Sequence, residues 1–296
     1  MTNVYFEGAA VAITTPFQDD VIDYEMYERH IEWLIENDIQ ALFVNGTTGE
    51  ASTLSEDEKL KLVEIAVKTA NKRIPIIVGT GTNNTQASIE HSLKVKALGA
   101  DGIMLITPYY NKTNQRGLIQ HFETIANAVQ LPVVLYNVPA RTNMTIEPET
   151  VLILSKNPYI YALKDATNDI EYTKKVKALV NEDFKLYSGN DDSMISFFEY
   201  GSGVISVVAN AIPSEIQNIY ELYQENPEQS KHAFDQVVPI IQSLDVDINP
   251  IPIKALMTHL GYAHGTVRLP LVPLLNDQVN TLIETYEMNK NRVSVI

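Results

Sequence analysis

Short, nearly continuous apolar runs recur along this 296-residue chain and are separated by amphipathic segments. Runs of this kind, without polar alternation, are typical of parallel strands that are covered on both faces. Their spacing, mostly about 25–35 residues, is that of one strand–helix unit. The pattern therefore predicts eight parallel strands, at residues 11–14, 41–45, 74–79, 102–106, 132–136, 159–164, 185–188 and 204–208.

The segments between these runs predict helices. One begins at Asp23 or Tyr24, and another follows Ser55, where Ser55 and Glu58 have the spacing of a capping box. The alternation predicts an α/β fold, a (β/α)8 TIM barrel. The alternative is an open doubly wound sheet, which usually has a glycine-rich turn after its first strand, whereas residues 14–17 here contain no glycine. The other expected helices cover residues 85–98, 115–129, 147–156, 170–180, 192–200 and 214–223.

The strand pattern stops after residue 223. Residues 228–244, 251–260 and 274–289 predict three more helices, a C-terminal three-helix appendage. No linker-like segment precedes them, so we expect them to pack on the barrel. The expected division is a catalytic barrel over residues 1–225 and a helical region over residues 226–296.

Charge and composition narrow the possible functions. The chain has 22 Lys and Arg against 37 Asp and Glu, a formal charge of −15, so we expect neither nucleic acid nor membrane as a partner. It has no cysteine, which excludes disulfides, thiolate metal ligands and thiol nucleophiles. The N-terminal residues show no leader pattern, and the longest apolar stretch, residues 201–214, is interrupted by polar residues. A cytoplasmic location is therefore expected.

The active site of such a barrel lies at the C-terminal ends of its strands. Lys164 ends one predicted strand, and Tyr136 ends the strand before it. Burial disfavours an ammonium ion, so a lysine there can be a free amine that forms a Schiff base. A neighbouring phenol can transfer the protons that imine chemistry requires. The alternative for Lys164 is a strand-end side chain that reaches water or pairs with Asp165.

Two further features could bind carboxylates. The turn at residues 46–49, Gly-Thr-Thr-Gly, offers hydroxyls and approachable backbone N–H groups, and Arg141 follows Tyr136 in the next loop. The alternatives are an ordinary strand–helix turn and an arginine that pairs with surface acids. The loops after the last two predicted strands are not glycine-rich, which disfavours a phosphorylated substrate. We expect no metal, because none of the histidines falls at a strand end: His30, His91, His121, His232, His259 and His264.

Nine motifs in order along the chain resemble those of the dihydrodipicolinate synthase family, which consists of pyruvate-dependent, class I aldolase-type lyases of bacterial lysine biosynthesis. The resemblance extends over nearly the whole chain. The motifs are GTTGE (46–50), GTGTN (79–83), TPYYN (107–111), YNVPARTN (136–143), LKDAT (163–167), YSGND (187–191), GVISV (203–207), NPIPIK (249–254) and RLPL (268–271).

The resemblance implies a reaction and a role for particular residues. Pyruvate would form a Schiff base with Lys164 and condense with L-aspartate 4-semialdehyde, without metal or organic cofactor. Tyr136 would transfer protons in a relay with Thr47 and with Tyr110, which family members supply across a subunit interface. The chain would then form a homo-oligomer, a dimer or a tetramer. The substrate-binding residues would be Thr48 and the backbone at Ile205 for pyruvate, and Arg141 for the carboxylate of the aldehyde.

Related activities form the alternatives. N-acetylneuraminate lyases share the barrel, the lysine and the tyrosine, but typically have GSTGE in place of GTTGE and lack the arginine of the YNVPxRT motif. Thr47 and Arg141 therefore favour the synthase. Other pyruvate-dependent sugar-acid aldolases, and a catalytically idle regulatory barrel, are the remaining alternatives.

The resemblance also bears on regulation. Family members that are inhibited by lysine bind it near the helix that follows GTTGE. The matching positions here are Glu56, Lys59 and Ala87. The Lys59 cation would repel the ammonium group of lysine, and Ala87 offers no carboxylate. We therefore expect weak or absent feedback inhibition by lysine.

Overall fold

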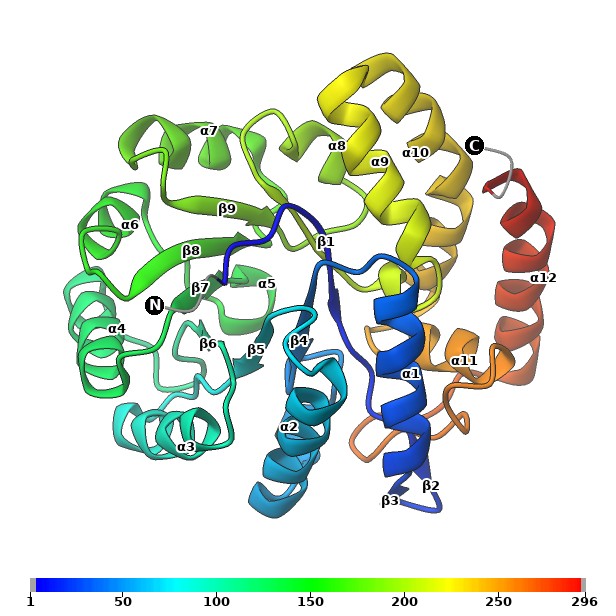
Figure 1. Ribbon diagram of the computed structural model, residues 1–296, viewed down its shortest axis with the longest axis horizontal. Helices are drawn as coiled ribbons and strands as arrows, with labels where there is room; N and C mark the ends of the chain where they lie inside the picture. The colour runs from blue at the N-terminus through cyan, green and yellow to red at the C-terminus, as the bar shows by residue number, and fades with distance from the viewer. Residues whose placement is uncertain (1–3, 294–296) are drawn as a thin grey trace.

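The computed structural model describes residues 4–293, in which eight of ten strands close into a parallel barrel surrounded by helices (Figure 1). β1 (Gly8–Ala12) closes the ring by pairing with both β4 (Ala41–Val44) and β10 (Gly203–Ser206). Each predicted apolar run overlaps one barrel strand, so the predicted fold class is confirmed. The other barrel strands are β5 (Ile76–Gly79), β6 (Gly102–Ile106), β7 (Val133–Asn137), β8 (Ile160–Asp165) and β9 (Lys185–Ser188).

The first strand begins earlier than predicted. The predicted run was residues 11–14, but β1 starts at Gly8, whose φ of +99° and missing side chain give no strand signal. A Cβ on Gly8 would lie 2.2 Å from Oε1 of Gln217, and this oxygen accepts a hydrogen bond from the Ala9 N–H at 2.8 Å. Close packing against Gln217 therefore requires a glycine at the start of β1.

A small hairpin after β1 was not predicted. It consists of β2 (Phe17–Gln18) and β3 (Val21–Ile22), which pair antiparallel. The two residues between them, Asp19 and Asp20, have φ values of 47° and 67°. A two-residue hairpin turn favours such left-handed conformations, and aspartate tolerates them better than most residues.

The helices follow the predicted alternation, with two differences in detail. The capping box is confirmed, because Ser55 Oγ accepts the Glu58 N–H and Glu58 Oε2 accepts the Ser55 N–H. α8 (Met194–Phe197) is shorter than the predicted 192–200, and α5 (Pro139–Thr142) was not predicted. The remaining barrel helices are α1 (Tyr24–Glu36), α2 (Glu56–Ala70), α3 (Thr85–Ala97), α4 (Gln115–Val129), α6 (Pro148–Leu154), α7 (Ile170–Leu179) and α9 (Pro213–Glu225). Short 3-10 turns occur at Ala51–Thr53, Val208–Asn210 and Leu244–Val246.

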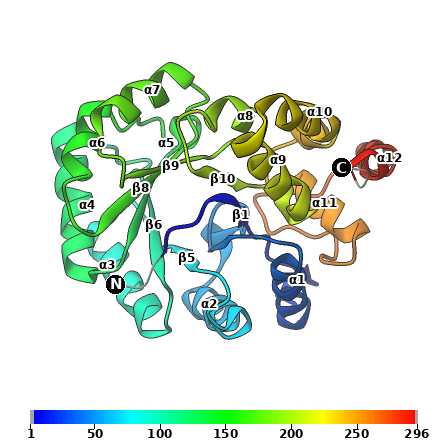
Figure 2. The same ribbon diagram turned by 45° about the horizontal axis from the view of Figure 1, so that its top comes forward.

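Three C-terminal helices lie on the same side of the barrel as α9 (Figures 1 and 2). They are α10 (Pro227–Ser243), α11 (Ile251–His259) and α12 (Asn276–Val293). Their buried side chains belong to the same hydrophobic cluster as those between the barrel and its helices. A division at residues 225 and 226 stays a prediction. In the described part of the chain, no helix combines the length and the apolar character that crossing a membrane requires.

Alternation along the strands decides which side chains enter the barrel. On β8, Ala162 belongs to the cluster inside the barrel, and Leu163 belongs to the cluster between the barrel and its helices. Successive side chains of a strand point to opposite faces, so Lys164 shares the inner side with Ala162. Tyr136 on β7 also belongs to the inner cluster. Both side chains therefore project inward near the C-terminal ends of their strands.

Candidate active site

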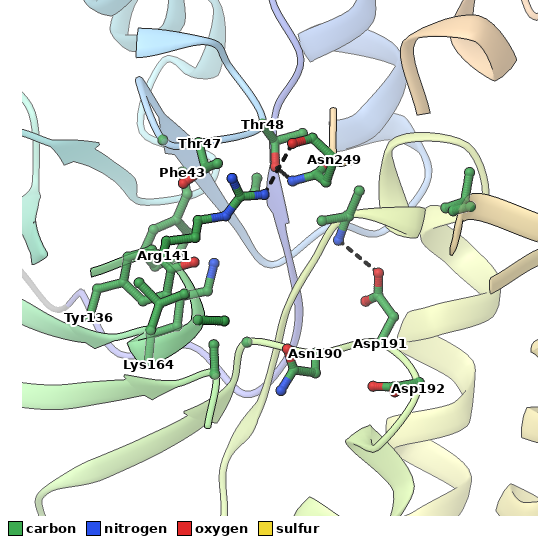
Figure 3. Close-up of a pocket in the computed structure, with 18 of the residues that line it drawn as sticks. Phe43, Thr47, Thr48, Tyr136, Arg141, Lys164, Asn190, Asp191, Asp192 and Asn249 are labelled. Atoms are coloured by element: carbon green, nitrogen blue, oxygen red, sulfur yellow. Dashed lines mark hydrogen bonds between the residues drawn. The ribbon is translucent and has the colours of Figure 1, made fainter. Parts of the chain in front are cut away.

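A cavity of about 320 Å³ lies at the C-terminal ends of the barrel strands (Figure 3). It brings together five of the seven predicted site residues, from four different strand ends and loops. These are Thr47, Thr48, Tyr136, Arg141 and Lys164. The cavity lining also includes polar and acidic side chains: Asn190, Asp191, Asp192, Asp245, Asp247 and Asn249.

Lys164 is buried, with only 5% of its surface exposed. Its Nζ lies 4.5 Å from the centroid of the Tyr136 ring, and the two residues are register partners on β7 and β8. Burial lowers the pKa of Lys164 to about 8; the negative charge of Asp191 raises it and the positive charge of Arg141 lowers it further. A lysine with this pKa has about a tenth of its amine unprotonated at pH 7 and about half at pH 8.

The alternative reading of Lys164, an ion pair with Asp165, is wrong. The Asp165 carboxylate instead accepts hydrogen bonds from the Thr167 N–H at 3.0 Å and the Thr173 hydroxyl at 2.9 Å. Asp165 therefore fixes the start of the loop after β8 and does not neutralise the amine.

Tyr136 is a neutral phenol beside this amine. Burial raises its pKa above the ordinary value, while the charge of Arg141 and a hydrogen bond with the Thr47 side chain lower it. A protonated phenol next to a free amine can donate a proton to a leaving oxygen and take one back. The pair therefore has the protonation states that imine formation requires.

A chain of two hydrogen bonds joins Arg141 to Thr48 through Asn249 (Figure 3). Nη2 of Arg141, on α5, donates to the backbone oxygen of Asn249 at 3.1 Å, and Nδ2 of Asn249 donates to Oγ1 of Thr48 at 3.1 Å. The sequence analysis assigned Asn249 no role, although it opens the NPIPIK motif. That motif was the available signal, but the contact across 201 positions in the chain could not be read from it.

The other two predicted site residues do not line the cavity. Tyr110 is 91% exposed and has a φ of +67°. Ile205 lies on β10 inside the barrel, where its buried side chain belongs to the inner cluster. Two roles stay predictions: that a second subunit supplies the Tyr110 hydroxyl to the relay, and that the backbone at Ile205 binds pyruvate.

Asp191 is a second residue that the sequence analysis left without a role. Its Oδ2 accepts hydrogen bonds from the N–H groups of Val207 and Val208, at 3.0 and 2.8 Å, and burial raises its pKa. These bonds join the loop after β9 to the loop after β10. Nearby, a Cβ on Gly189 would lie 3.1 Å from Cε of Lys164, so this glycine leaves the space that the lysine occupies.

Glu50, the last residue of the GTTGE motif, forms a buried ion pair with Lys254. Both side chains are 1% exposed, and Glu50 Oε2 also accepts the Arg268 N–H at 2.9 Å. Lys254 Nζ lies 4.0 Å from the centroid of the Phe17 ring, and burial lowers the pKa of Lys254 to about 8 although Glu50 raises it. Three motifs, GTTGE, NPIPIK and RLPL, thus meet in one structural contact.

A second cavity of about 220 Å³ adjoins the first and shares Thr47 and Tyr136 with it. Lys59 and His91 line it, whereas Glu56 is engaged by His91 at 3.0 Å and by Lys94 at 3.1 Å. The expected repulsion of lysine by Lys59 and the weak feedback inhibition that would follow from it stay predictions. Among the described residues, no group of three or more His, Asp or Glu side chains could hold a metal ion.

Comparison with known proteins identifies the family. Residues 5–288 match the model of the dihydrodipicolinate synthetase family. The chain belongs to this family. It is 62% identical over 285 residues to a 4-hydroxy-tetrahydrodipicolinate synthase of Macrococcus caseolyticus, a match that covers 96% of each chain. A protein of the same name from Staphylococcus epidermidis is 55% identical over 287 residues, which cover 96% of this chain and 97% of the relative.

Solved structures of the dihydrodipicolinate synthetase family agree with this assignment. The dihydrodipicolinate synthase of Acinetobacter baumannii, solved in complex with pyruvate, superposes with a TM-score of 0.94 at 37% identity. The match covers 97% of this chain and 99% of that one. The resemblance found in the motifs is therefore confirmed, and the synthase is favoured over the N-acetylneuraminate lyases.

Proposed function

We propose that this protein is a lyase that condenses pyruvate with L-aspartate 4-semialdehyde through a Schiff base on Lys164, as a step of lysine and diaminopimelate biosynthesis. The observation that carries the proposal is the buried Lys164 amine packed on the Tyr136 ring, in a cavity that also contains the Arg141 cation. The names of the relatives and the pyruvate in the A. baumannii structure support it.

The first step is imine formation. The unprotonated Nζ of Lys164 attacks the keto carbon of pyruvate, and the bond formed gives a carbinolamine. Tyr136 donates its phenolic proton to the departing oxygen, which leaves as water, and the nitrogen becomes an iminium. Thr48 and the backbone at Ile205 hold the carboxylate of pyruvate.

The second step makes the carbon–carbon bond. Tyr136, which gave up its proton in the first step, takes one methyl proton and converts the iminium into an enamine. The enamine carbon adds to the aldehyde carbon of L-aspartate 4-semialdehyde, and the Tyr136 proton passes to the aldehyde oxygen. Arg141 binds the carboxylate of this acceptor, and its planar guanidinium suits such an anion. The amino group of the acceptor then attacks the iminium carbon and releases the Lys164 amine with the cyclic product. None of these steps requires a metal or organic cofactor.

The exposed Tyr110 supports an oligomer. Its side chain is 91% exposed on a loop beside the site, and we infer that a second copy of the chain brings this hydroxyl to the Thr47–Tyr136 relay. The protein would then be at least a dimer, and we propose a cytoplasmic location for it. Light scattering on the purified protein tests the oligomer, and a monomer with full activity would contradict it.

The test of the proposed function is a direct comparison of acceptor aldehydes. With pyruvate present, the purified protein should consume L-aspartate 4-semialdehyde in a coupled assay much faster than N-acetylmannosamine. Preference for the sugar would instead assign the protein to the lyases. An idle barrel would show neither reaction and no rise in unfolding temperature with pyruvate, because only a ligand that binds the native state stabilises it.

A further inference from the structure

The segment between α10 and α11 forms one wall of the catalytic cavity, although it lies outside the eight strand–helix units. Leu244, Asp245, Asp247 and Asn249 all line the cavity. Asn249 lies next to Thr48 and Arg141 in this wall (Figure 3). The C-terminal region therefore takes part in the site itself.

The two hydrogen bonds of Asn249 use different parts of the residue. Its side-chain Nδ2 donates to Thr48 Oγ1, whereas its backbone oxygen accepts from Arg141 Nη2. The Oδ1 atom of Asn249 is buried and has no hydrogen-bond partner among the described residues. Loss of the side chain would therefore break the contact with Thr48 and leave the contact with Arg141 in place.

The direction of the first bond decides what the Thr48 hydroxyl can do. A hydroxyl has one proton to donate and two lone pairs that accept. Because one lone pair of Thr48 accepts the Asn249 N–H, the hydroxyl proton is turned toward another acceptor. A carboxylate in the cavity is a strong acceptor for that proton.

A second contact joins the turn that carries Thr48 to the segment that carries Asn249. Glu50, two residues after Thr48, forms the buried ion pair with Lys254, and the Lys254 N–H donates to the backbone oxygen of Pro250 at 3.0 Å. The turn and the segment are thus joined by a buried contact close to the hydrogen bond. Because the protein places the Thr48 and Asn249 side chains before substrate binds, these side chains lose little conformational freedom on binding.

We propose that Asn249 is a positioning residue for pyruvate: its carboxamide orients the Thr48 hydroxyl toward the keto-acid carboxylate, and its backbone oxygen separately holds Arg141. This inference rests on the proposed function. It gives the C-terminal region a part in binding pyruvate. The side chain of Asn249 acts on pyruvate through Thr48, and its backbone oxygen acts on L-aspartate 4-semialdehyde through Arg141.

The test is a double-mutant cycle of Asn249→Ala and Thr48→Val, with initial rates measured against each substrate. Asn249→Ala should raise the KM for pyruvate about fivefold, the effect of losing one neutral hydrogen bond. The KM for L-aspartate 4-semialdehyde should stay unchanged. Because Asn249 acts through Thr48, the double variant should have the same KM for pyruvate as Thr48→Val alone.

Two further variants keep the test decisive. Gln242→Ala, at an exposed site near the end of α10, is the matched control and should leave both KM values unchanged. If Asn249→Ala unfolds at the assay temperature, the isosteric Asn249→Asp, which has no N–H to donate, takes its place. Additive effects in the cycle, an unchanged KM for pyruvate, or equal effects on both substrates would overturn the proposal. A wild-type protein that shows no pyruvate-dependent turnover would instead refute the proposed function.

Discussion

Tyr136 and Lys164 face each other as register partners on adjacent parallel strands, with the lysine Nζ 4.5 Å from the centroid of the tyrosine ring. The ring covers the amine and helps to exclude water from it, and burial is the largest cause of the lowered pKa of Lys164. One contact between two inward-facing side chains therefore combines a nucleophile with the group that can move its protons.

Replacing Tyr136 by phenylalanine should slow the reaction without disturbing the lysine. The ring that packs on Lys164 remains, but the proton donor is lost, so kcat should fall about 10²–10⁴-fold, the usual size of such a contribution. The KM for pyruvate should change little. Tyr109→Phe, on the neighbouring cavity, is the control and should keep its activity. Steady-state kinetics of both variants decide this, and a fully active Tyr136→Phe would contradict the proton-transfer role.

The activity should depend on pH through the amine of Lys164. Only the unprotonated amine attacks, and the lysine pKa is about 8. The value of kcat/KM for pyruvate should therefore fall about tenfold per unit as the pH drops below that value. An acid limb near the ordinary lysine pKa would contradict the desolvation of Lys164.

A substitution at Asp191 tests whether the acid limb of the pH profile follows the pKa of Lys164. Its negative charge raises the pKa of Lys164, so Asp191→Asn should move the acid limb to lower pH. The same substitution at the exposed Asp192 should move it much less. A shift to higher pH in Asp191→Asn would show that the carboxylate acts on the amine in some other way.

Gly189→Ala should displace the nucleophile. The new Cβ would lie 2.8 Å from Cβ of Ala166, 3.1 Å from the backbone oxygen of Asp165 and 3.1 Å from Cε of Lys164. Something must shift, and a misplacement of about 1 Å can cost about 10²-fold in rate. We expect kcat/KM for pyruvate to fall while the far-UV circular dichroism spectrum is unchanged. Wild-type kinetics would show that the lysine tolerates the methyl group.

Lys254→Met should destabilise the protein strongly, because it leaves the Glu50 carboxylate buried without a cation. Removing one partner of a buried pair costs about 3–5 kcal/mol of unfolding free energy. The double variant Glu50→Gln, Lys254→Met removes both charges and should unfold at a higher urea concentration than the single one. Lys61→Met, which breaks an exposed pair with Glu64, is the control and should have little effect. Equal midpoints for Lys254→Met and Lys61→Met would contradict a role for the buried pair.

The sequence was informative about the barrel because a parallel strand that is buried on both faces must be almost wholly apolar. The sequence was less informative where a residue is present because it leaves room for a neighbouring side chain or because it adopts the backbone conformation of a turn. β1 was misplaced because Gly8 packs on Gln217, and the β2–β3 hairpin depends on two aspartates with positive φ. α5, which carries Arg141, is too short to show a helical period.

The sequence predicted the site residues that lie at the ends of strands. Lys164 and Tyr136 were found because each ends an apolar run, and alternation along the strands places both inside the barrel. Asn249 and Asp191 contact loops that are distant in the sequence, and no local pattern encodes such contacts. Both residues belong to motifs of the family, but a motif does not show which residues its members contact.

The most direct test of the account is reductive trapping with pyruvate and borohydride, followed by mass spectrometry of the intact chain and of its peptides. Two buried lysines of the described part of the chain, Lys164 and Lys254, have a pKa of about 8, and of these two Lys164 lines the cavity. The account predicts one pyruvate-derived mass per chain, located on the peptide that contains Lys164 and absent from Lys164→Ala. The same mass on Lys164→Ala, or on the peptide that contains Lys254, would contradict it.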